Sequence, residues 1–108
     1  MWKGGRLTEA AFKGIFFILM FEFDPEKSAA NLEKQGIDFV EAQRLWDDVH
    51  GVTFDAVSRD ERRFALIASL EDKTWTAFFT VRYKKIRLIS VRRARSNERK
   101  VYEQSISD

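Results

Sequence analysis

The sequence predicts a single α+β domain in which an antiparallel sheet packs against helices. The chain has 108 residues, of which 44% are hydrophobic, and this is enough for one compact domain with one core. Apolar residues recur at helical spacing as far as Asp48, whereas runs of β-branched and aromatic residues follow from Val52 onward. With 14% aromatic residues and one proline, the composition excludes general disorder.

The first elements are predicted from local signals. Met20–Phe23 alternates weakly and is typical of a short strand. Asp24 and Pro25 then suit the N-cap and first turn of a helix, and Gly36 suits its left-handed C-terminal cap. We expect a second helix over Phe39–Asp48 whose apolar stripe faces the core.

Four strands and a last helix complete the predicted domain. The strands are expected to form an antiparallel meander, at Val52–Phe54, Arg63–Leu70, Thr74–Val81 and Lys85–Val91. In the last strand, strict alternation predicts one face with Ile86, Leu88 and Ser90 and another with Arg87, Ile89 and Val91. The helix Ser96–Ser105 begins with a capping-box-like Ser96, with Glu98 near the acidic position.

Residues 1–19 are predicted to be an extension of a single domain that occupies residues 20–108. Basic residues precede the apolar run Ile15–Phe21, as in a signal peptide, but no small-residue cleavage site follows. The seven residues of this run fall short of the roughly 20 that cross a bilayer. We therefore expect no membrane span, and an extension that comes from an early start codon or from cloning.

The residue types exclude several classes of chemistry. The chain has no cysteine and a single histidine, His50, which excludes disulfides, thiolate nucleophiles and metal sites that need two imidazoles. It also lacks a glycine-rich phosphate loop and a dinucleotide fingerprint. The sequence therefore predicts no metal and no cofactor, and the absence of cysteine fits a cytoplasmic location.

Charge is divided unevenly along the chain. Residues 21–80 carry seven basic and thirteen acidic side chains, whereas residues 81–108 carry nine basic and three acidic ones. The basic residues of the carboxyl-terminal part are interleaved with Tyr83 and Tyr102: Arg82, Lys84, Lys85, Arg87, Arg92, Arg93, Arg95, Arg99 and Lys100. Guanidinium groups hold phosphates and aromatic rings stack on unpaired bases, so this pattern favours RNA. The alternative is a strand and a helix whose exposed faces are basic for solubility.

Several motifs, taken together, resemble the BrnT family of ribonuclease toxins. They comprise Phe23–Lys27, Asn31, Lys34–Phe39, Glu41–Ala42, Asp47, the pair Glu61 and Arg63, Ile86–Ala94, Glu98 and Tyr102. The resemblance covers residues 21–104 and implies a RelE-like fold for a single BrnT-like toxin domain. It implies an RNA substrate, cleaved to arrest bacterial growth. It also implies a BrnA-like ribbon-helix-helix antitoxin as partner, contact with DNA only through that antitoxin, and a dimeric or heterotetrameric complex.

The resemblance also implies a set of site residues. The expected catalytic residues are Lys34, Glu61, Arg63, Arg82 and Arg92. The expected RNA-binding residues are Lys27, Asn31, Arg87, Arg93 and Tyr102. Lysine and arginine would neutralise phosphate, and Glu61 would act as a base or position an arginine. Structural alternatives are a cross-strand pair of Glu61 and Arg63, a plain helix surface at Lys27 and Asn31, and an ion pair of Arg93 with Glu98.

The chain departs from the family pattern at several positions. Gln35 stands where the family has a histidine between lysine and glycine, and Asp48 and Ala68 replace a usual proline and glycine. Two alternatives to an active toxin therefore stay open. One is a catalytically degenerate member that only binds the antitoxin in a repressor complex, and the other is a nucleic-acid-binding module without a toxin role.

Overall fold

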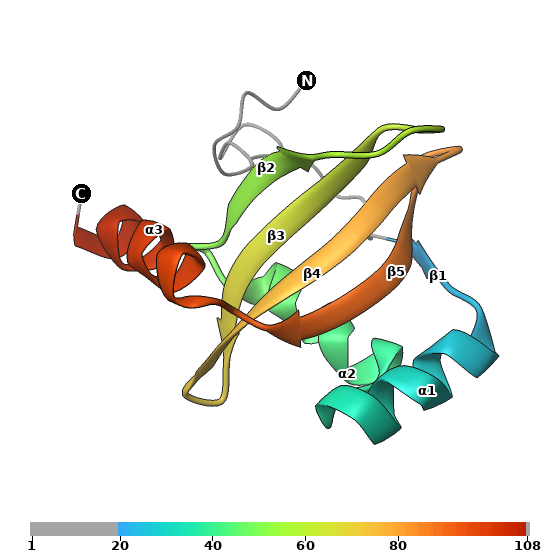
Figure 1. The fold of residues 1–108 in the computed structure, drawn as a ribbon, viewed down its shortest axis with the longest axis horizontal. Coiled ribbons are helices and arrows are strands. Elements are labelled where there is room, and N and C mark those ends of the chain that lie inside the picture. The colour runs from blue at the N-terminus through green and yellow to red at the C-terminus, as the bar shows by residue number, and fades with distance from the viewer. Residues whose placement is uncertain (1–19, 108) are drawn as a thin grey trace.

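The computed structural model of the protein describes residues 20–107, in which five strands form one mixed sheet and three α-helices flank it (Figure 1). The elements are β1 (Met20–Glu22), α1 (Pro25–Gln35), α2 (Phe39–Ala42), the 3₁₀ helix η2 (Gln43–Asp47), β2 (Val52–Ala56), β3 (Arg63–Leu70), β4 (Lys73–Arg82), β5 (Lys85–Arg93) and α3 (Ser96–Ser107). The strand order is β1-β5-β4-β3-β2, and β1 runs parallel to β5 while all other pairs are antiparallel. The predicted α+β class and antiparallel meander are confirmed. The predicted extension, residues 1–19, lies outside the described residues.

The caps of α1 are those that the sequence predicts. The Asp24 carboxylate accepts a hydrogen bond from the backbone N–H of Glu26 at 2.9 Å. At the other end Gly36 has φ of 83° and donates its N–H to the carbonyl of Leu32, a left-handed geometry that glycine adopts without steric cost. The helix therefore begins and ends where local chemistry places its boundaries.

The prediction of one helix over Phe39–Asp48 is wrong in one respect, because this segment is not a continuous α-helix. After α2 the chain tightens into η2. Side chains three residues apart lie above one another in a 3₁₀ helix, and Phe39, Ala42 and Leu45 are all completely buried. The change from an α-helix to a 3₁₀ helix thus lets the apolar residues of both segments face the sheet.

The main core lies between the sheet and the α2–η2 segment. Phe39 and Leu45 pack there against Phe79, Leu88 and Val91 of β4 and β5. A smaller cluster lies on the opposite face of the sheet, where α3 covers only one end, and it contains Ile67, Ala94, Tyr102 and Phe54. The rest of that second face has no helix over it among the described residues (Figure 1).

A β-bulge in β5 changes the predicted alternation of that strand. Phe78 pairs with Ser90, but the next residue, Phe79, pairs with Leu88, so Ile89 is an extra residue. An extra residue shifts the side-chain alternation by one position. Val91 therefore returns to the core beside Leu88 and is 1% exposed, which corrects the prediction that they lie on opposite faces.

Asn31 of α1 continues the edge of the sheet where β1 ends. β1 pairs only with residues 85–87 of β5. Farther along β5, the Asn31 side-chain amide accepts from the N–H of Val91 at 3.1 Å and donates to its carbonyl at 3.0 Å. The same amide nitrogen donates to the carbonyl of Ile37 at 2.7 Å. One side chain thus satisfies backbone groups of two segments.

Replacing Asn31 with alanine is expected to lower the free energy of unfolding by about 2–3 kcal/mol, because part-buried backbone groups at Val91 and Ile37 lose their partners. Urea denaturation of the two proteins measures this difference. Asn31→Asp is the informative companion, since it keeps the acceptor but removes both donors. A loss below about 0.5 kcal/mol for Asn31→Ala would contradict the structural role.

Among residues 20–107, no helix has the length and apolar character needed to span a membrane.

Candidate nucleic-acid interface

The uncovered face of the sheet carries two arginines in one cross-strand row and a further arginine toward the other end of the strands. The pairing of Phe64 with Phe79 places Arg63 level with Thr80, whose other neighbour is Arg87. Four residues away along β4, Thr76 pairs with Arg92. Since neighbouring strands are about 4.8 Å apart, the backbones that carry the two arginines of this row are separated by about 10 Å.

Glu61 contacts two arginines at this end of the face, one in the row and one beyond it. Its Oε1 accepts from Nη2 of Arg82 at 3.1 Å, and its Oε2 lies 3.7 Å from Nε of Arg63. The Nε of Arg63 is buried and has no hydrogen-bond partner among the described residues. An unsatisfied buried donor costs free energy, so this guanidinium keeps hydrogen-bonding capacity that the fold does not use. The sequence-predicted trio Glu61, Arg63 and Arg82 is therefore brought together.

Arg87 belongs to the same row but has a different partner. Its Nη1 lies 3.6 Å from the Glu22 carboxylate of β1. Both side chains are about one-third exposed, and such exposed pairs contribute little to stability. Arg87 is therefore open to exchange Glu22 for a phosphate.

A second arginine cluster lies at the other end of the face. Arg92 and Glu98 form two parallel hydrogen bonds of 2.8 Å each, between β5 and α3. Glu98 also accepts from the Thr76 hydroxyl at 2.9 Å and from the Arg95 N–H at 2.7 Å. The Arg92 guanidinium lies 5.2 Å from the centre of the Phe78 ring. Arg92 is thus held by Glu98 and Phe78, and Glu98 is itself fixed by Thr76 and Arg95.

The Arg95 contact corrects the predicted helix cap. The N-cap of α3 is Arg95, not Ser96, because the Arg95 carbonyl accepts from the N–H of Arg99 and the Arg95 N–H reaches Glu98. Glu98 is then exactly three residues after the cap, as a capping box requires. It pairs with Arg92, whereas Arg93 lies over the Trp75 ring at 5.5 Å, so the alternative Arg93–Glu98 pair is wrong.

Arg92 lowers the pKa of Glu98 to about 2, and the bonds from Arg95 and Thr76 act in the same direction against the effect of burial. The carboxylate also raises the pKa of Arg92. Because the folded pKa of Glu98 lies below its usual 4.5, the ionised pair stabilises the fold above about pH 4.5. This stabilisation is lost as the pH falls from about 4.5 to about 2.

The Glu98→Gln variant is expected to unfold with a free energy about 2 kcal/mol lower at pH 7, and the difference is expected to shrink as the pH approaches 2. Urea titrations of both proteins at several pH values measure it. Thr76→Val is the matched control, since it removes one bond to Glu98 without removing a charge. A difference that stays constant from pH 7 to pH 2.5 would contradict the linkage.

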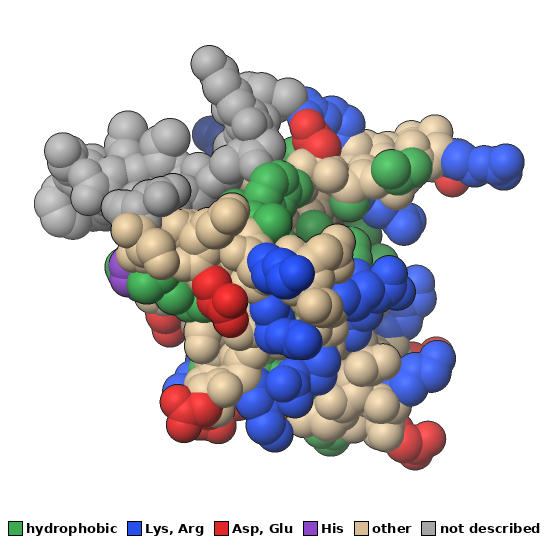
Figure 2. Space-filling view, turned by 60° about the vertical axis from the view of Figure 1, so that its left-hand side comes forward, with side chains coloured by type: hydrophobic (Ala, Val, Ile, Leu, Met, Phe, Trp, Pro, Cys, Tyr) green, Lys and Arg blue, Asp and Glu red, His purple; other side chains and the backbone are tan. Residues whose placement is uncertain are grey.

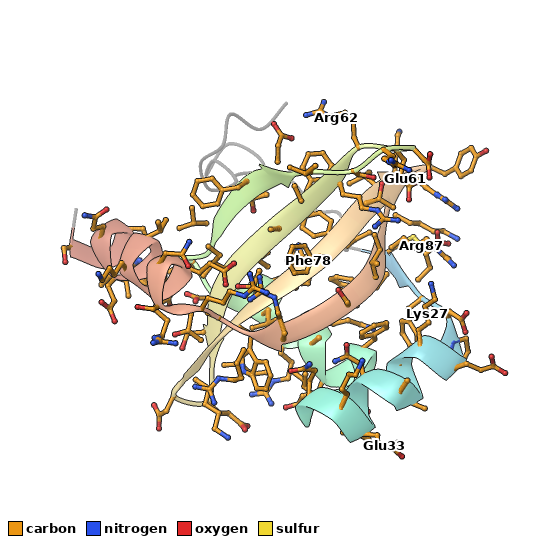
Figure 3. The ribbon with its side chains drawn as sticks, in the orientation of Figure 1. Lys27, Glu33, Glu61, Arg62, Phe78 and Arg87 are labelled. Carbon is orange, nitrogen blue, oxygen red and sulfur yellow. The ribbon has the colours of Figure 1, made fainter. Side chains whose placement is uncertain are left out.

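The remaining predicted site residues lie elsewhere. Lys27 and Lys34 are exposed on α1, which lies beside the β5 edge of the sheet, outside the strands (Figures 1 and 3). The Asn31 amide is already occupied by backbone groups. Tyr102 is buried and donates its hydroxyl to Asp48 at 2.6 Å. RNA contact by these four residues stays a prediction, and the structure gives Asn31 and Tyr102 roles in the fold.

Sequence reasoning missed Phe78, which lies in the middle of the uncovered face (Figure 3). The signal was present, because in β4 the residues Trp75, Ala77 and Phe79 are buried in the core and Phe78 alternates with them. Viewed from a different side, the molecule shows Lys and Arg side chains gathered in a band with few acidic side chains between them (Figure 2). The interface therefore combines arginines with one aromatic ring.

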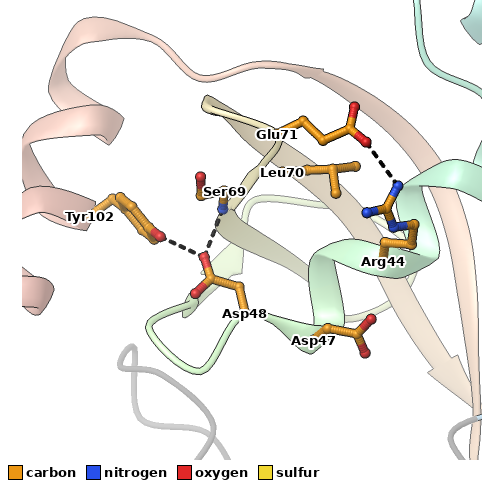
Figure 4. A pocket seen from close by; sticks show the side chains of 7 residues that line it. All are labelled: Arg44, Asp47, Asp48, Ser69, Leu70, Glu71 and Tyr102. Carbon is orange, nitrogen blue, oxygen red and sulfur yellow. Dashed lines mark hydrogen bonds and ion pairs between the residues drawn. The ribbon is translucent and has the colours of Figure 1, made fainter.

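A hollow of about 380 Å³ opens between η2, the β3–β4 turn and α3 (Figure 4). It is lined by Arg44, Asp47, Asp48, Ser69, Leu70, Glu71 and Tyr102. Burial and the hydrogen bond to Asp48 raise the pKa of Tyr102 to about 12. The lining of the hollow has three acidic residues and one basic residue, which suits a phosphate poorly. Among residues 20–107 no group of three or more His, Asp and Glu side chains is placed to hold a metal ion.

The fold and the arginine face together define a class, a small α+β protein whose mixed sheet carries arginines on a face that no described helix covers. The family model described as the ribonuclease toxin, BrnT, of type II toxin-antitoxin system matches residues 23–98. The chain therefore belongs to the BrnT family of type II toxin-antitoxin ribonuclease toxins. No curated protein matches the chain at a significant level. The family match confirms the resemblance found in the sequence, and with it the expectation of an antitoxin partner.

Proposed function

We propose that this chain cleaves RNA and arrests growth until a ribbon-helix-helix antitoxin of the BrnA type binds it. The observation that carries the proposal is the group of Arg63, Arg82 and Arg87 at one end of the face, with Glu61 between the first two. The family implies an antitoxin, and a type that itself binds DNA would bring the pair to the operon as a dimeric or heterotetrameric complex. The proposed compartment is the cytoplasm.

The proposed reaction is an internal transfer at one phosphate. The ribose 2′-hydroxyl loses its proton and its oxygen attacks the adjacent phosphorus, the bond from phosphorus to the 5′-oxygen breaks, and the 5′-oxygen takes a proton from water, so that a 2′,3′-cyclic phosphate and a 5′-hydroxyl result. Arg63 and Arg82 would neutralise the charge that develops on the phosphate oxygens. Glu61 lies between them and would accept the 2′-hydroxyl proton or keep both guanidinium groups in place.

Arg92 and Lys34 have supporting parts in this proposal. Arg92 is fixed by Glu98 and Phe78 and would bind a phosphate farther along the same strand. Lys34 lies in the last turn of α1 and would contact the backbone of a longer RNA. Lys27 and Arg93 are proposed as further phosphate contacts because both are exposed.

Expression of the chain without any antitoxin tests the proposal. The expected result is growth arrest with RNA breakdown, and cleavage of RNA by the purified protein in the presence of a chelator. A product ending in a cyclic phosphate is the expected chemical signature. Normal growth at good expression of folded protein, together with no cleavage in vitro, would overturn it.

The alternative function, a partner that only binds the antitoxin, is favoured by one observation, since Gln35 cannot act as the acid or base that a histidine supplies. This alternative predicts a tight complex with the antitoxin and no RNA cleavage. A Gln35→His variant separates the two, because gain of cleavage in that variant alone would show a site that has lost one group. Equal cleavage by both proteins would show that the histidine is dispensable.

A further inference from the structure

Phe78 is a large aromatic side chain that the hydrophobic cores do not use. It is absent from the main core and from the smaller cluster under α3, although its neighbour Phe79 is completely buried. Phe78 itself is partly exposed on the uncovered face of the sheet. Exposing aromatic surface on an otherwise polar face brings no gain in folding, so core packing does not explain this residue.

The side chains around Phe78 are small. Its cross-strand partners are Ala65 on β3 and Ser90 on β5, and its neighbours two residues away on β4 are Thr76 and Thr80. Because side chains two residues apart on a strand share a face, the ring rises above a floor of small residues. None of these four side chains is large enough to cover the ring, and the Arg92 guanidinium lies over only one of its two faces.

Positive charge flanks the ring at both ends of the face. Arg92 lies over the ring at 5.2 Å, and the row of Arg63 and Arg87 lies two residues along the strands in the other direction, about 7 Å away at the usual rise per residue. A backbone whose phosphates meet these arginines carries its bases over the centre of the face. The centre is Phe78.

We propose that Phe78 is the platform on which one unpaired base of the RNA stacks, between Arg92 on one side and the row of Arg63 and Arg87 on the other. The inference rests on the proposed function for its ligand and narrows it to single-stranded RNA, because a base inside a duplex is already stacked and cannot reach a ring on a sheet. Stacking on an aromatic ring accepts any base, so Phe78 contributes affinity and placement of the scissile phosphate without selecting sequence.

Fluorescence of 2-aminopurine in a short 2′-O-methyl oligonucleotide tests the proposal. The methyl group blocks attack by the 2′-oxygen, so this probe binds without being cleaved. We expect the protein to quench the base, Phe78→Tyr to quench it equally, and Phe78→Leu to lose the quenching and bind about tenfold more weakly. Phe54→Leu is the matched control, since Phe54 lies on the same face but packs against the cluster under α3.

An oligonucleotide without the base at that position separates stacking from a merely structural role. If Phe78 only supports Arg92, Phe78→Leu weakens binding of the abasic and base-bearing probes equally, and this result would overturn the proposal. Unchanged quenching in Phe78→Leu would overturn it as well. Quenching that depends on Phe78 in a protein that cleaves no RNA would support the platform while refuting the proposed ribonuclease activity.

Discussion

Replacing Arg63 with alanine is expected to slow RNA cleavage by about 10²- to 10³-fold, the usual cost of losing one group that stabilises transition-state charge. Arg63 lies beside Glu61, and its buried Nε has no hydrogen-bond partner among the described residues. Stability should change by less than about 1 kcal/mol, because the pair with Glu61 is long and partly exposed. Single-turnover cleavage of a labelled RNA measures the rate.

The adjacent residue supplies a matched control. Arg62 is exposed and pairs with Asp55 at 2.8 Å, and its guanidinium lies 5.2 Å from the Phe64 ring. Arg62→Ala removes the same charge from the neighbouring position, away from Glu61. We expect cleavage within about threefold of the unmodified protein, the effect of net charge on association alone.

The response to RNA concentration separates two uses of Arg63. If this arginine acts only by attracting RNA, raising the RNA concentration restores the rate of Arg63→Ala, and both arginine variants lose the same amount. If it acts on the reacting phosphate, the maximal rate stays low at saturating RNA. Restoration at saturation would therefore contradict the catalytic role while leaving a binding role intact.

Elements with local signals could be predicted from the sequence. Both ends of α1 follow from Asp24 and Gly36, each of which acts within a few residues of itself. The bounds of β3 agree exactly with the predicted strand, since its β-branched and aromatic run lies between polar segments. In these places the local preference and the final fold agree.

Features that depend on distant partners could not be predicted. The bulge at Ile89 depends on how β4 pairs with β5. Asn31 meets Val91, sixty residues away, only because β1 is too short to cover that edge. Asparagine suits both an exposed helix surface and a sheet edge, so the residue type alone does not reveal the second role. The family resemblance alone predicts RNA contact for Asn31.

In the candidate site, too, contacts between residues close in sequence could be predicted, whereas contacts that depend on distant elements could not. Glu61 and Arg63 are close in sequence, and their contact needs only one turn into β3. The pair of Arg92 with Glu98 depends on Arg95 being the N-cap of α3, and the sequence conceals this because arginine is an unusual residue at that position. Phe78 was missed because a single aromatic residue in an apolar strand is assigned to the core unless the pairing of that strand is known.

Replacing Asp48 with alanine is expected to lower the free energy of unfolding by about 3–4 kcal/mol, because several hydrogen bonds to its carboxylate are lost together. Its carboxylate accepts from the Ser69 N–H at 2.8 Å, the Tyr102 hydroxyl at 2.6 Å and the His50 N–H at 2.9 Å. These contacts join η2, β3 and α3, and alanine would leave part-buried donors without acceptors. Since small domains are stable by only about 5–15 kcal/mol, much of the margin would be lost.

Asp47→Ala is the control for this prediction, because Asp47 is exposed and lines the same hollow. It is expected to change stability by less than about 0.5 kcal/mol. Thermal unfolding should then show a melting temperature roughly 12 °C or more lower for Asp48→Ala alone. Equal effects of the two substitutions would contradict the proposed role of the three hydrogen bonds to Asp48, since both changes would then reflect only the loss of negative charge near Glu71.

The pH dependence provides an independent check of the same contact. Tyr102 has a pKa of about 12 in the fold against 10 for an ordinary tyrosine, so its contribution is complete below about pH 10 and is lost as the pH rises toward 12. In Tyr102→Phe this alkaline loss should be absent, and Asp48→Ala should weaken it because one of the two main causes of the raised pKa is removed. If burial alone fixes the tyrosine, Asp48→Ala will leave the alkaline transition unchanged, and the carboxylate then holds α3 less firmly than its 2.6 Å bond indicates.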